Sequence, residues 1–96
     1  FSRSRGLGDV YKRQAYFKRG KIFRGLGEIE KAILDYDRYI SIFPEDFKGY
    51  VNRGIAKAQG EDFQGAKKDL EEGLKINPKD QIALFHLKEV EKNLND

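Results

Sequence analysis

Residues 34 positions apart match one another along the middle of this chain of 96 residues. Other offsets align few residues, but at 34 six of seven compared positions are identical, and only Lys21 and Ile55 differ. The identical pairs are Tyr16 and Tyr50, Arg19 and Arg53, Gly20 and Gly54, Ala32 and Ala66, Asp35 and Asp69, and Pro44 and Pro78. A period of this length indicates a stacked repeat, in which each unit buries its apolar face only against its neighbours.

The spacing of the apolar residues predicts an all-α protein. From residue 15 onward these residues recur three and four positions apart, and strand-type alternation is absent. Glycines and prolines divide the pattern into five helices, expected at about 14–26, 28–42, 46–59, 62–76 and 80–94. Asp46, Asp62 and Asp80 stand where side chains would accept the free amides at the start of three helices.

Composition limits what such a chain can be. With 39% hydrophobic content, 96 residues suffice for one small domain, and no apolar run is long enough to span a bilayer. The chain has no cysteine, which excludes disulfides, thiolate nucleophiles and sulfur-ligated zinc but leaves the compartment open. We expect a soluble protein, with the cytoplasm favoured.

A two-helix unit that repeats every 34 residues resembles the tetratricopeptide repeat. The resemblance assigns repeat 1 to residues 13–46 and repeat 2 to residues 47–80, and it implies a right-handed solenoid of helical hairpins. Lys57 departs from the aromatic residue of the family pattern, and Gly60 stands one residue early for the turn. The structural positions of the family are filled by Tyr16, Gly20, Ala32, Tyr36 and Pro44 in repeat 1, and by Tyr50, Gly54, Ala66, Leu70 and Pro78 in repeat 2.

Each unit carries the same arginine and the same aspartate, sixteen residues apart. Arg19 with Asp35, and Arg53 with Asp69, would lie on facing helices, so we expect one partly buried salt bridge in each unit. The small residues of each unit, glycine on the first helix and alanine on the second, should let the two helices approach closely.

Residues 81–96 are predicted to form a capping helix. They keep leucine at the large positions of the repeat, Leu84 and Leu87, but carry Lys88 in place of the glycine. A solenoid needs such an end, because an uncovered last face would be an exposed apolar patch. The start of a third repeat is the alternative. The apolar face is expected to consist of Ile82, Phe85, Leu87, Val90 and Leu94.

The first thirteen residues are interpreted separately from the repeats. The stretch RGLGDVYKRQ at 5–14 resembles a translated adapter sequence at the ends of metagenomic protein fragments, so residues 1–13 are expected to be non-native or disordered. A native basic arm is the alternative. Residues 1–14 hold the whole net charge of +3, since residues 15–96 contain fifteen basic and fifteen acidic groups. The echo of RGLGDV in RGLGEI at 24–29 is interpreted as accidental, and no phosphate loop is expected.

The chain offers little material for catalysis or for metal binding. His86 is the only histidine, and no base stands near a nucleophile at a spacing that suggests a catalytic group. Asp35 and Asp37 diverge by about 200° around a helix, so they cannot share a ligand. We expect no enzymatic activity, no cofactor and no metal.

The resemblance implies a concave groove lined by the first helix of each unit and by the final helix. Residues 15–27 and 47–60 carry net charges of +4 and +3, whereas residues 28–42 and 61–77 carry −2 each. An acidic peptide or a terminal carboxylate is therefore the expected ligand, with solvated charges as the alternative. The groove positions are Gln14, Phe17, Lys18, Lys21 and Arg24, then Lys48, Val51, Asn52, Ile55 and Gln59, and finally Phe85, His86 and Glu89.

Some members of the family clamp the terminal carboxylate of a peptide with a set of lysines, asparagines and an arginine. Asn52 matches one of these positions, and Lys21 stands where the set has an asparagine. Phe17, Ile82 and His86 stand at positions that should be basic. The resemblance therefore implies at most a looser version of this clamp.

These observations predict a non-enzymatic adaptor that binds a protein or peptide, acidic in character, in a groove of basic helices. One alternative is a structural segment of a longer solenoid, and another is a basic nucleic-acid binder led by residues 3–24. Neither nucleic acid nor a membrane is the expected partner. Because about three repeats are normally needed for independent stability, two copies of the chain could also pair.

Overall fold

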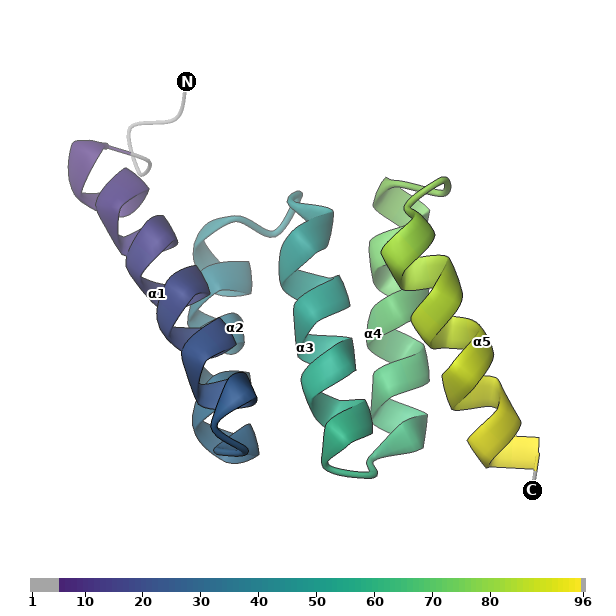
Figure 1. Ribbon diagram of the computed structural model, residues 1–96. Coiled ribbons are helices and arrows are strands. Elements are labelled where there is room, and N and C mark those ends of the chain that lie inside the picture. Colours follow the sequence, from purple (N-terminus) through teal and green to yellow (C-terminus); the bar gives the residue numbers. More distant parts are fainter. Residues whose placement is uncertain (1–5, 96) are drawn as a thin grey trace.

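The computed structural model describes residues 6–95, and this part of the chain forms five helices and no strand (Figure 1). Four of the helices begin and end within one residue of the bounds that the sequence predicts, and the first begins earlier. The helices are α1 (Leu7–Gly25), α2 (Ile29–Ile42), α3 (Phe47–Gln59), α4 (Phe63–Ile76) and α5 (Gln81–Asn95).

Helix α1 starts at Leu7, seven residues before the predicted start near residue 14. Residues 7–13 contain no proline, and Asp9 lies in the first turn, where a negative charge favours a helix. Arg13 is also held from outside the helix, because its Nη2 lies 2.9 Å from Oδ2 of Asp46. Residues 7–13 are therefore helical rather than disordered. Residues 1–5 of the expected arm lie outside the described residues, and a non-native origin of residues 1–13 stays a prediction.

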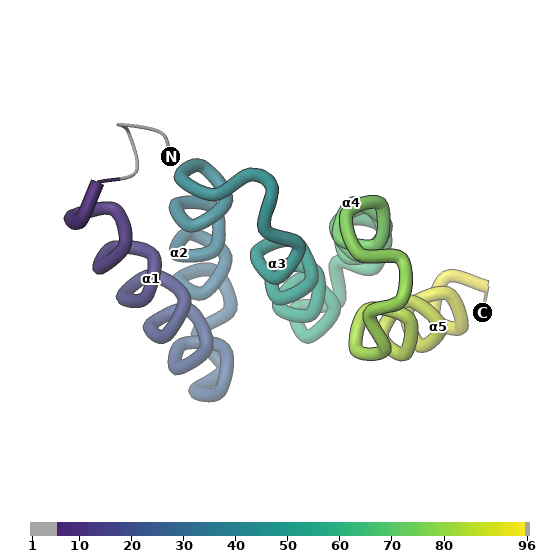
Figure 2. The backbone as a smooth tube through the Cα atoms, turned by 90° about the horizontal axis from the view of Figure 1, so that it is seen from above, coloured from purple at the N-terminus to yellow at the C-terminus, as the bar shows by residue number. Residues whose placement is uncertain are grey.

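The helices lie in two layers. Seen from above, α1, α3 and α5 lie on one side and α2 and α4 on the other, so each unit is a hairpin with its first helix in the same layer (Figure 2). The described chain extends over 46 × 29 × 17 Å, as expected for hairpins stacked along one direction.

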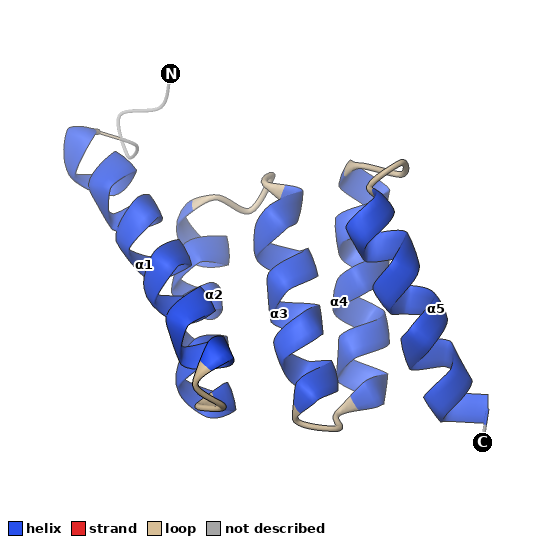
Figure 3. Ribbon diagram, viewed as in Figure 1, coloured by secondary structure: helices blue, strands red, loops and turns tan. Residues whose placement is uncertain are grey.

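The turns inside the two hairpins have the same backbone geometry (tan in Figure 3). The amide of Glu28 donates to the Phe23 carbonyl, and the amide of Asp62 donates to the Lys57 carbonyl, both at 2.8 Å. The residue before each amide is left-handed, with a φ of 81° at Gly27 and 66° at Glu61. Because the glycine of the second turn stands one residue early, a glutamate occupies the position that favours glycine.

Three aspartates cap the starts of helices, as the sequence predicts. Asp46 accepts a hydrogen bond from the amide of Lys48 at 3.0 Å, and Asp62 accepts one from Gly65 at 3.0 Å. Asp80 accepts one from Ala83 at 2.9 Å. Each bond satisfies an amide that has no partner inside its helix.

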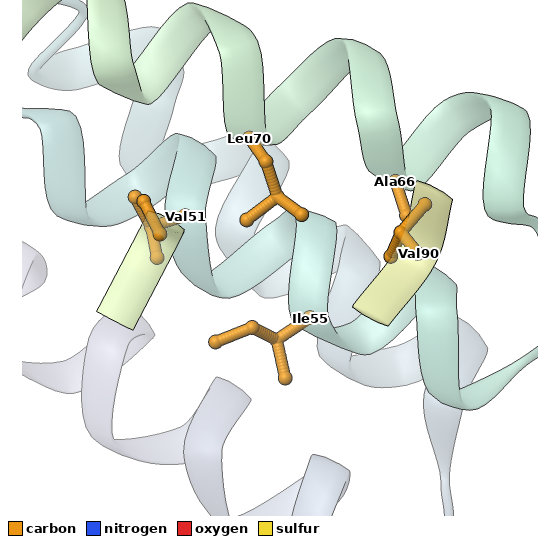
Figure 4. Close-up of a cluster of buried hydrophobic side chains, with 6 residues drawn as sticks. Val51, Ile55, Ala66, Leu70 and Val90 are labelled. Carbon is orange, nitrogen blue, oxygen red and sulfur yellow. The ribbon is translucent and has the colours of Figure 1, made fainter. Parts of the chain in front are cut away.

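The core consists of two groups of buried side chains, and each is centred on one hairpin. Ala32 and Tyr36 of the first hairpin are fully buried together with Ala56, which α3 contributes from the second. The first hairpin is thus sealed by the next one, as expected for a stacked repeat. The second group joins α3, α4 and α5 (Figure 4) and contains Val51, Ile55, Ala66, Leu70, Ala83 and Val90.

The expected close approach of the helices occurs in both hairpins. A Cβ atom at Gly54 would lie 3.1 Å from the carbonyl oxygen of Ala66, and one at Gly20 would lie 2.8 Å from the ring of Tyr36. Neither position has room for a methyl group without a shift of its neighbours.

Helix α5 packs on α4 through a face that only partly matches the prediction. Ala83 and Val90 are buried and Leu87 and Leu94 are partly buried, but Ile82 and Phe85 are 58% and 61% exposed. The prediction was wrong for Ile82 and Phe85, because the face containing Ala83 fits against α4. Because the Ala83 side of α5 points toward the core, Ile82 and Phe85 point away from it.

Candidate functional site

A groove of about 560 Å³ lies between the three helices of one layer. Helix α3 supplies its floor, and α1 and α5 supply its two sides. We call it the main groove. It is lined by Phe17, Lys21, Arg24, Phe47, Lys48, Val51, Asn52, Ile55, Asp80, Ile82 and His86.

Most of the residues that the sequence places in a groove line this one. They are Phe17, Lys21, Arg24, Lys48, Val51, Asn52, Ile55 and His86. Gln14 and Lys18 instead line a smaller hollow of about 190 Å³, which shares Phe17 and Lys48 with the main groove. The predicted positions that line neither hollow are Gln59, Phe85 and Glu89.

The groove positions expected from the sequence did not include three lining residues, Phe47, Asp80 and Ile82, although Ile82 was placed at a position of the family's carboxylate clamp. Ile82 carried a signal, since it follows the predicted groove residue Lys48 by one 34-residue period. Asp80 was assigned only as a helix cap, and its place in the groove follows from how α5 packs on α4.

Both predicted ion pairs inside the units are present. Arg19 donates to Asp35 through Nε and Nη2, each at 2.8 Å, and Arg53 donates to Asp69 in the same way at the same distances. The carboxylates are buried, with side chains only 1% and 5% exposed. Hydrogen bonds from the Arg19 guanidinium hold the pKa of Asp35 below its usual value, although burial acts in the opposite direction.

The second ion pair belongs to a larger network. Arg53 also donates to Asp37 of α2 at 2.7 Å, and the ammonium group of Lys57 lies 3.0 Å from Asp69. The hydrogen bond to Asp69 raises the pKa of Arg53. Lys57, which departs from the aromatic residue of the family pattern, therefore provides a second positive charge for a buried carboxylate.

The cations that line the main groove differ from these paired arginines. Lys21, Arg24 and Lys48 form no ion pair with any residue between 6 and 95. The one carboxylate in the lining, that of Asp80, accepts the helix-capping bond from Ala83. The arginines inside the hairpins, Arg19 and Arg53, are thus neutralised by buried carboxylates. The cations that line the groove have no such partner among the described residues.

Arg24 is partly buried at one side of the groove. Its Nε atom is inaccessible to solvent, and so is the hydroxyl of Tyr36; neither atom has a hydrogen-bond partner of standard geometry among the described residues. Burial raises the pKa of Tyr36, and the neighbouring Arg24 side chain opposes this effect through its charge and through hydrogen bonding to the phenol. His86 lines the groove from α5, and its pKa is lowered by burial and by the charge of Arg24.

The smaller hollow is bordered by a hydrogen-bonded network around Asp46. This carboxylate accepts from the hydroxyl of Tyr39, from Arg13 and from the amide of Lys48. The guanidinium carbon of Arg13 also lies 4.7 Å from the centre of the Phe43 ring. Burial and the bond to Asp46 raise the pKa of Tyr39 to about 12, so this phenol stays protonated at neutral pH.

Asn52 uses only part of its hydrogen-bonding capacity within the described residues. Its Nδ2 atom donates to the carbonyl of Lys48 at 2.8 Å, which fixes the side chain along α3. An amide nitrogen has two hydrogens, so one donor and the Oδ1 acceptor remain. The floor of the groove therefore carries an oriented amide between apolar side chains, Val51 and Ile55.

The described residues show neither a membrane-spanning helix nor a metal cluster. Between residues 6 and 95, no helix is both long enough and apolar enough to cross a bilayer. The same residues contain no group of three or more potential ligands from His, Cys, Asp and Glu that could hold a metal ion.

Comparison with known proteins agrees with the hairpin architecture. The family model for the tetratricopeptide repeat matches residues 14–46 and 47–80. The chain belongs to the tetratricopeptide repeat family. The boundary between the two matches falls just before α3, so each match covers one hairpin. No curated protein sequence matches this repeat protein significantly.

Solved structures share the arrangement of these tetratricopeptide hairpins, and sixteen chains match significantly. One is described as the first TPR of Spaghetti (RPAP3) bound to the HSP90 peptide SRMEEVD. It superposes with a TM-score of 0.85 and 24% sequence identity, and the alignment covers 92% of this chain and 70% of that one. At this identity the likeness establishes the shared fold.

Proposed function

We propose that this tetratricopeptide repeat protein is a non-enzymatic interaction module that holds an acidic peptide segment in the main groove. The observation that carries the proposal is the set of unpaired cations, Lys21, Arg24 and Lys48, around a hollow that contains the single carboxylate of Asp80 among the described residues. An anionic ligand would supply the missing negative charge.

The rest of the lining fits an extended peptide. Phe17, Val51, Ile55 and Ile82 offer apolar surface, and Asn52 offers one free amide donor to a main-chain carbonyl or a carboxylate. The structural relative described above was solved with SRMEEVD, a peptide that contains two glutamates and an aspartate. That peptide is a suitable first probe for this groove.

The test is fluorescence anisotropy with N-terminally labelled SRMEEVD, together with a display library of random peptides with free C-termini. We expect micromolar binding that weakens as salt rises, and enrichment of Asp and Glu in the library. The double variant Lys21→Glu with Asn52→Ala should weaken binding at least tenfold. Lys68→Glu on α4 is the matched control, because its exposed side chain lies outside the main groove.

Two outcomes decide against the proposal. One is a double variant that binds as tightly as the unmodified chain, since the ligand would then lie elsewhere. The other is a library that enriches basic or purely apolar peptides. Circular dichroism of each variant establishes that the helices are intact.

The exposed surface of α5 favours a second candidate function, that of a segment within a longer solenoid. Leu84 follows Tyr50 by one repeat period, yet it is 42% exposed, and Phe85 is more exposed still. A further helix packed here would bury them. Sedimentation of the 96-residue chain with and without Leu84→Glu tests this candidate: self-association through the open face should disappear in the variant.

The ion pairs of α1 argue against a nucleic-acid function led by residues 3–24. Arg13 and Arg19, which would have to contact phosphates, are bound to Asp46 and Asp35. Binding of a labelled oligonucleotide that survives 200 mM salt and disappears on deletion of residues 1–13 would reverse this preference.

A further inference from the structure

We propose that the main groove binds an internal segment of a partner protein, in which a large apolar side chain is flanked by acidic residues, and that no chain terminus is required. The inference rests on the proposed function and names the class of segment that the groove selects. It differs from the capture of a terminal carboxylate, because the central contact is apolar.

The centre of the main groove is apolar. Val51 and Ile55 of α3 form its floor and are 3% and 7% exposed. Phe17 of α1 lies on one side, and Ile82 of α5, which is 58% exposed, lies on the other. An apolar side chain that enters between Phe17 and Ile82 would remove the exposed surface of Ile82 from water, and this burial favours binding.

Among the residues that the structure describes, the lining lacks the converging donors that a terminal carboxylate needs. Ile82 and His86 stand on the α5 side, where a clamp for that group would have cations. Burial lowers the pKa of His86, so its ring is neutral at pH 7. Asp80 adds a carboxylate to the lining, which repels a second one. Asn52 contributes one free amide hydrogen on the floor.

The smaller hollow gives the ligand chain room to continue. It adjoins the main groove, because the two hollows share Phe17 and Lys48. Their volumes are about 560 Å³ and 190 Å³, so together they have space for several residues and not only for one end group. A chain that occupies both hollows passes between Phe17 and Lys48 and does not end in the main groove.

Cations adjoin the apolar centre from more than one helix. Lys21 and Arg24 line the main groove from α1, Lys48 stands at the start of α3, and Lys18 lines the smaller hollow. None of these four cations forms an ion pair with a residue between 6 and 95. The Lys21 ammonium lies 5.7 Å from the centre of the Phe17 ring, so charge and apolar wall are neighbours. This arrangement fits acidic residues on both sides of an apolar one.

The experiment compares probes with free and blocked C-termini on the full chain by fluorescence anisotropy. SRMEEVD, in which the valine stands between a glutamate and the aspartate, is used as the free acid and as the C-terminal amide. We expect the two Kd values to agree within about threefold, because the loss of one charge weakens the attraction only modestly. A larger loss on amidation overturns the inference, since the groove would then recognise the terminus.

A second pair of probes tests the apolar contact from the side of the ligand. The N-terminally labelled amide GSEDLEDSG presents a leucine between acidic residues and has both ends blocked. GSEDSEDSG, labelled and amidated in the same way, has the same charge without the leucine. The leucine probe should bind at least about fivefold more tightly than the serine probe. Equal affinities would show that charge alone holds the peptide, which contradicts the apolar contact.

Two variants on α5 test the same contact from the side of the protein. Ile82→Ser removes an apolar wall at a position that is 58% exposed, so the fold should be retained. Leu84→Ser, on the same helix but outside both hollows, is the matched control. Ile82→Ser should weaken binding of the leucine probe at least about fivefold, and Leu84→Ser should leave it unchanged. If the two variants bind alike, the apolar contact is not in this groove.

Lys18→Gln tests the continuation into the smaller hollow. It should weaken binding of GSEDLEDSG about threefold, because an exposed cation contributes modestly and in a salt-dependent way. Lys68→Gln on α4 is the charge-matched control and should bind normally. Equal binding by the two variants would show that the chain does not extend into this hollow.

These outcomes separate the inference from the proposed function. If SRMEEVD binds as the free acid but not as the amide, the groove remains a site for acidic peptides and the internal segment is wrong. If no acidic peptide binds in either form, the proposed function fails and the inference fails with it.

Discussion

Arg53 of α3 donates from Nη1 to Oδ1 of Asp37 on α2 at 2.7 Å, while its Nε and Nη2 atoms hold Asp69 on α4. One guanidinium therefore joins the two helices of its own hairpin and links them to the preceding hairpin. In repeat proteins the contacts between neighbouring units supply much of the stability.

Arg53→Gln should lower the free energy of unfolding by about 2 kcal/mol, because it leaves a buried carboxylate with only Lys57 as a partner. Asp37→Asn should cost less than about 1 kcal/mol, since the Asp37 side chain is 47% exposed. Urea denaturation followed by circular dichroism measures both. Equal losses in the two variants would contradict the central role of the bond to Asp69.

Gly54→Ala should destabilise the chain by about 1–3 kcal/mol through overpacking. The added methyl group would meet Leu70, the Ala66 carbonyl and Asp69 at 3.0–3.2 Å. The Ala66 carbonyl is part of the α4 backbone, so it can move away only if the helix moves with it. Gly25→Ala is the control, because a Cβ there meets nothing within 4 Å. Thermal melts should show a lower Tm for the first variant only.

Glu61→Gly should stabilise the chain by about 0.5 kcal/mol, because it removes a side chain from a left-handed position (φ 66°). The greater flexibility of glycine in the unfolded state offsets part of this gain. Glu61→Gln has the same backbone strain and should give no gain. Gly27 is the equivalent residue of the first turn and is also left-handed. Gly27→Ala should therefore lower the free energy of unfolding by about 1 kcal/mol. A gain from Glu61→Gln equal to that from Glu61→Gly would assign the effect to charge.

Tyr39→Phe and Tyr36→Phe should differ, although each removes one buried hydroxyl group. Tyr39 donates to Asp46, so its loss should cost about 1 kcal/mol. The Tyr36 hydroxyl has no hydrogen-bond partner of standard geometry among the described residues, so its removal should change the free energy of unfolding by less than about 0.5 kcal/mol. Chemical denaturation of the two variants side by side checks the contrast, and a larger loss for Tyr36→Phe would show that its hydroxyl is bonded.

Acid should destabilise the chain partly through Asp35. Its pKa is lower in the folded state than in the unfolded chain, so its contribution is present above the unfolded value near 4 and is lost as the pH falls through the folded value. The Tm should therefore drop steeply below about pH 4. Asp35→Asn should have a lower Tm at pH 7 and a shallower drop in acid; a drop as steep as in the unmodified chain would assign the effect to other carboxylates.

The sequence predicted the paired residues well because each pair obeys the 34-residue period. Arg19 and Asp35 recur as Arg53 and Asp69, and repetition makes it possible to identify facing positions without a structure. The helix caps, such as Asp62, were predictable for a similar reason, since a cap depends on neighbours three residues away. The family model, which matches residues 14–46 and 47–80, reflects the same period.

The sequence by itself determined the repeat, the helices and the small residues at which they cross, because these depend on spacing along the chain. Only the tertiary structure decided which face of α5 turns inward, so that Ala83 is buried and Phe85 exposed. It also decided that Arg53 reaches Asp37 of the preceding hairpin, and that Arg24 lines the groove without an ion-pair partner among the described residues. Side-chain pairing across helices depends on distances in space. The spacing of residues along the chain reveals such a pair only where the same two residues recur in both repeats.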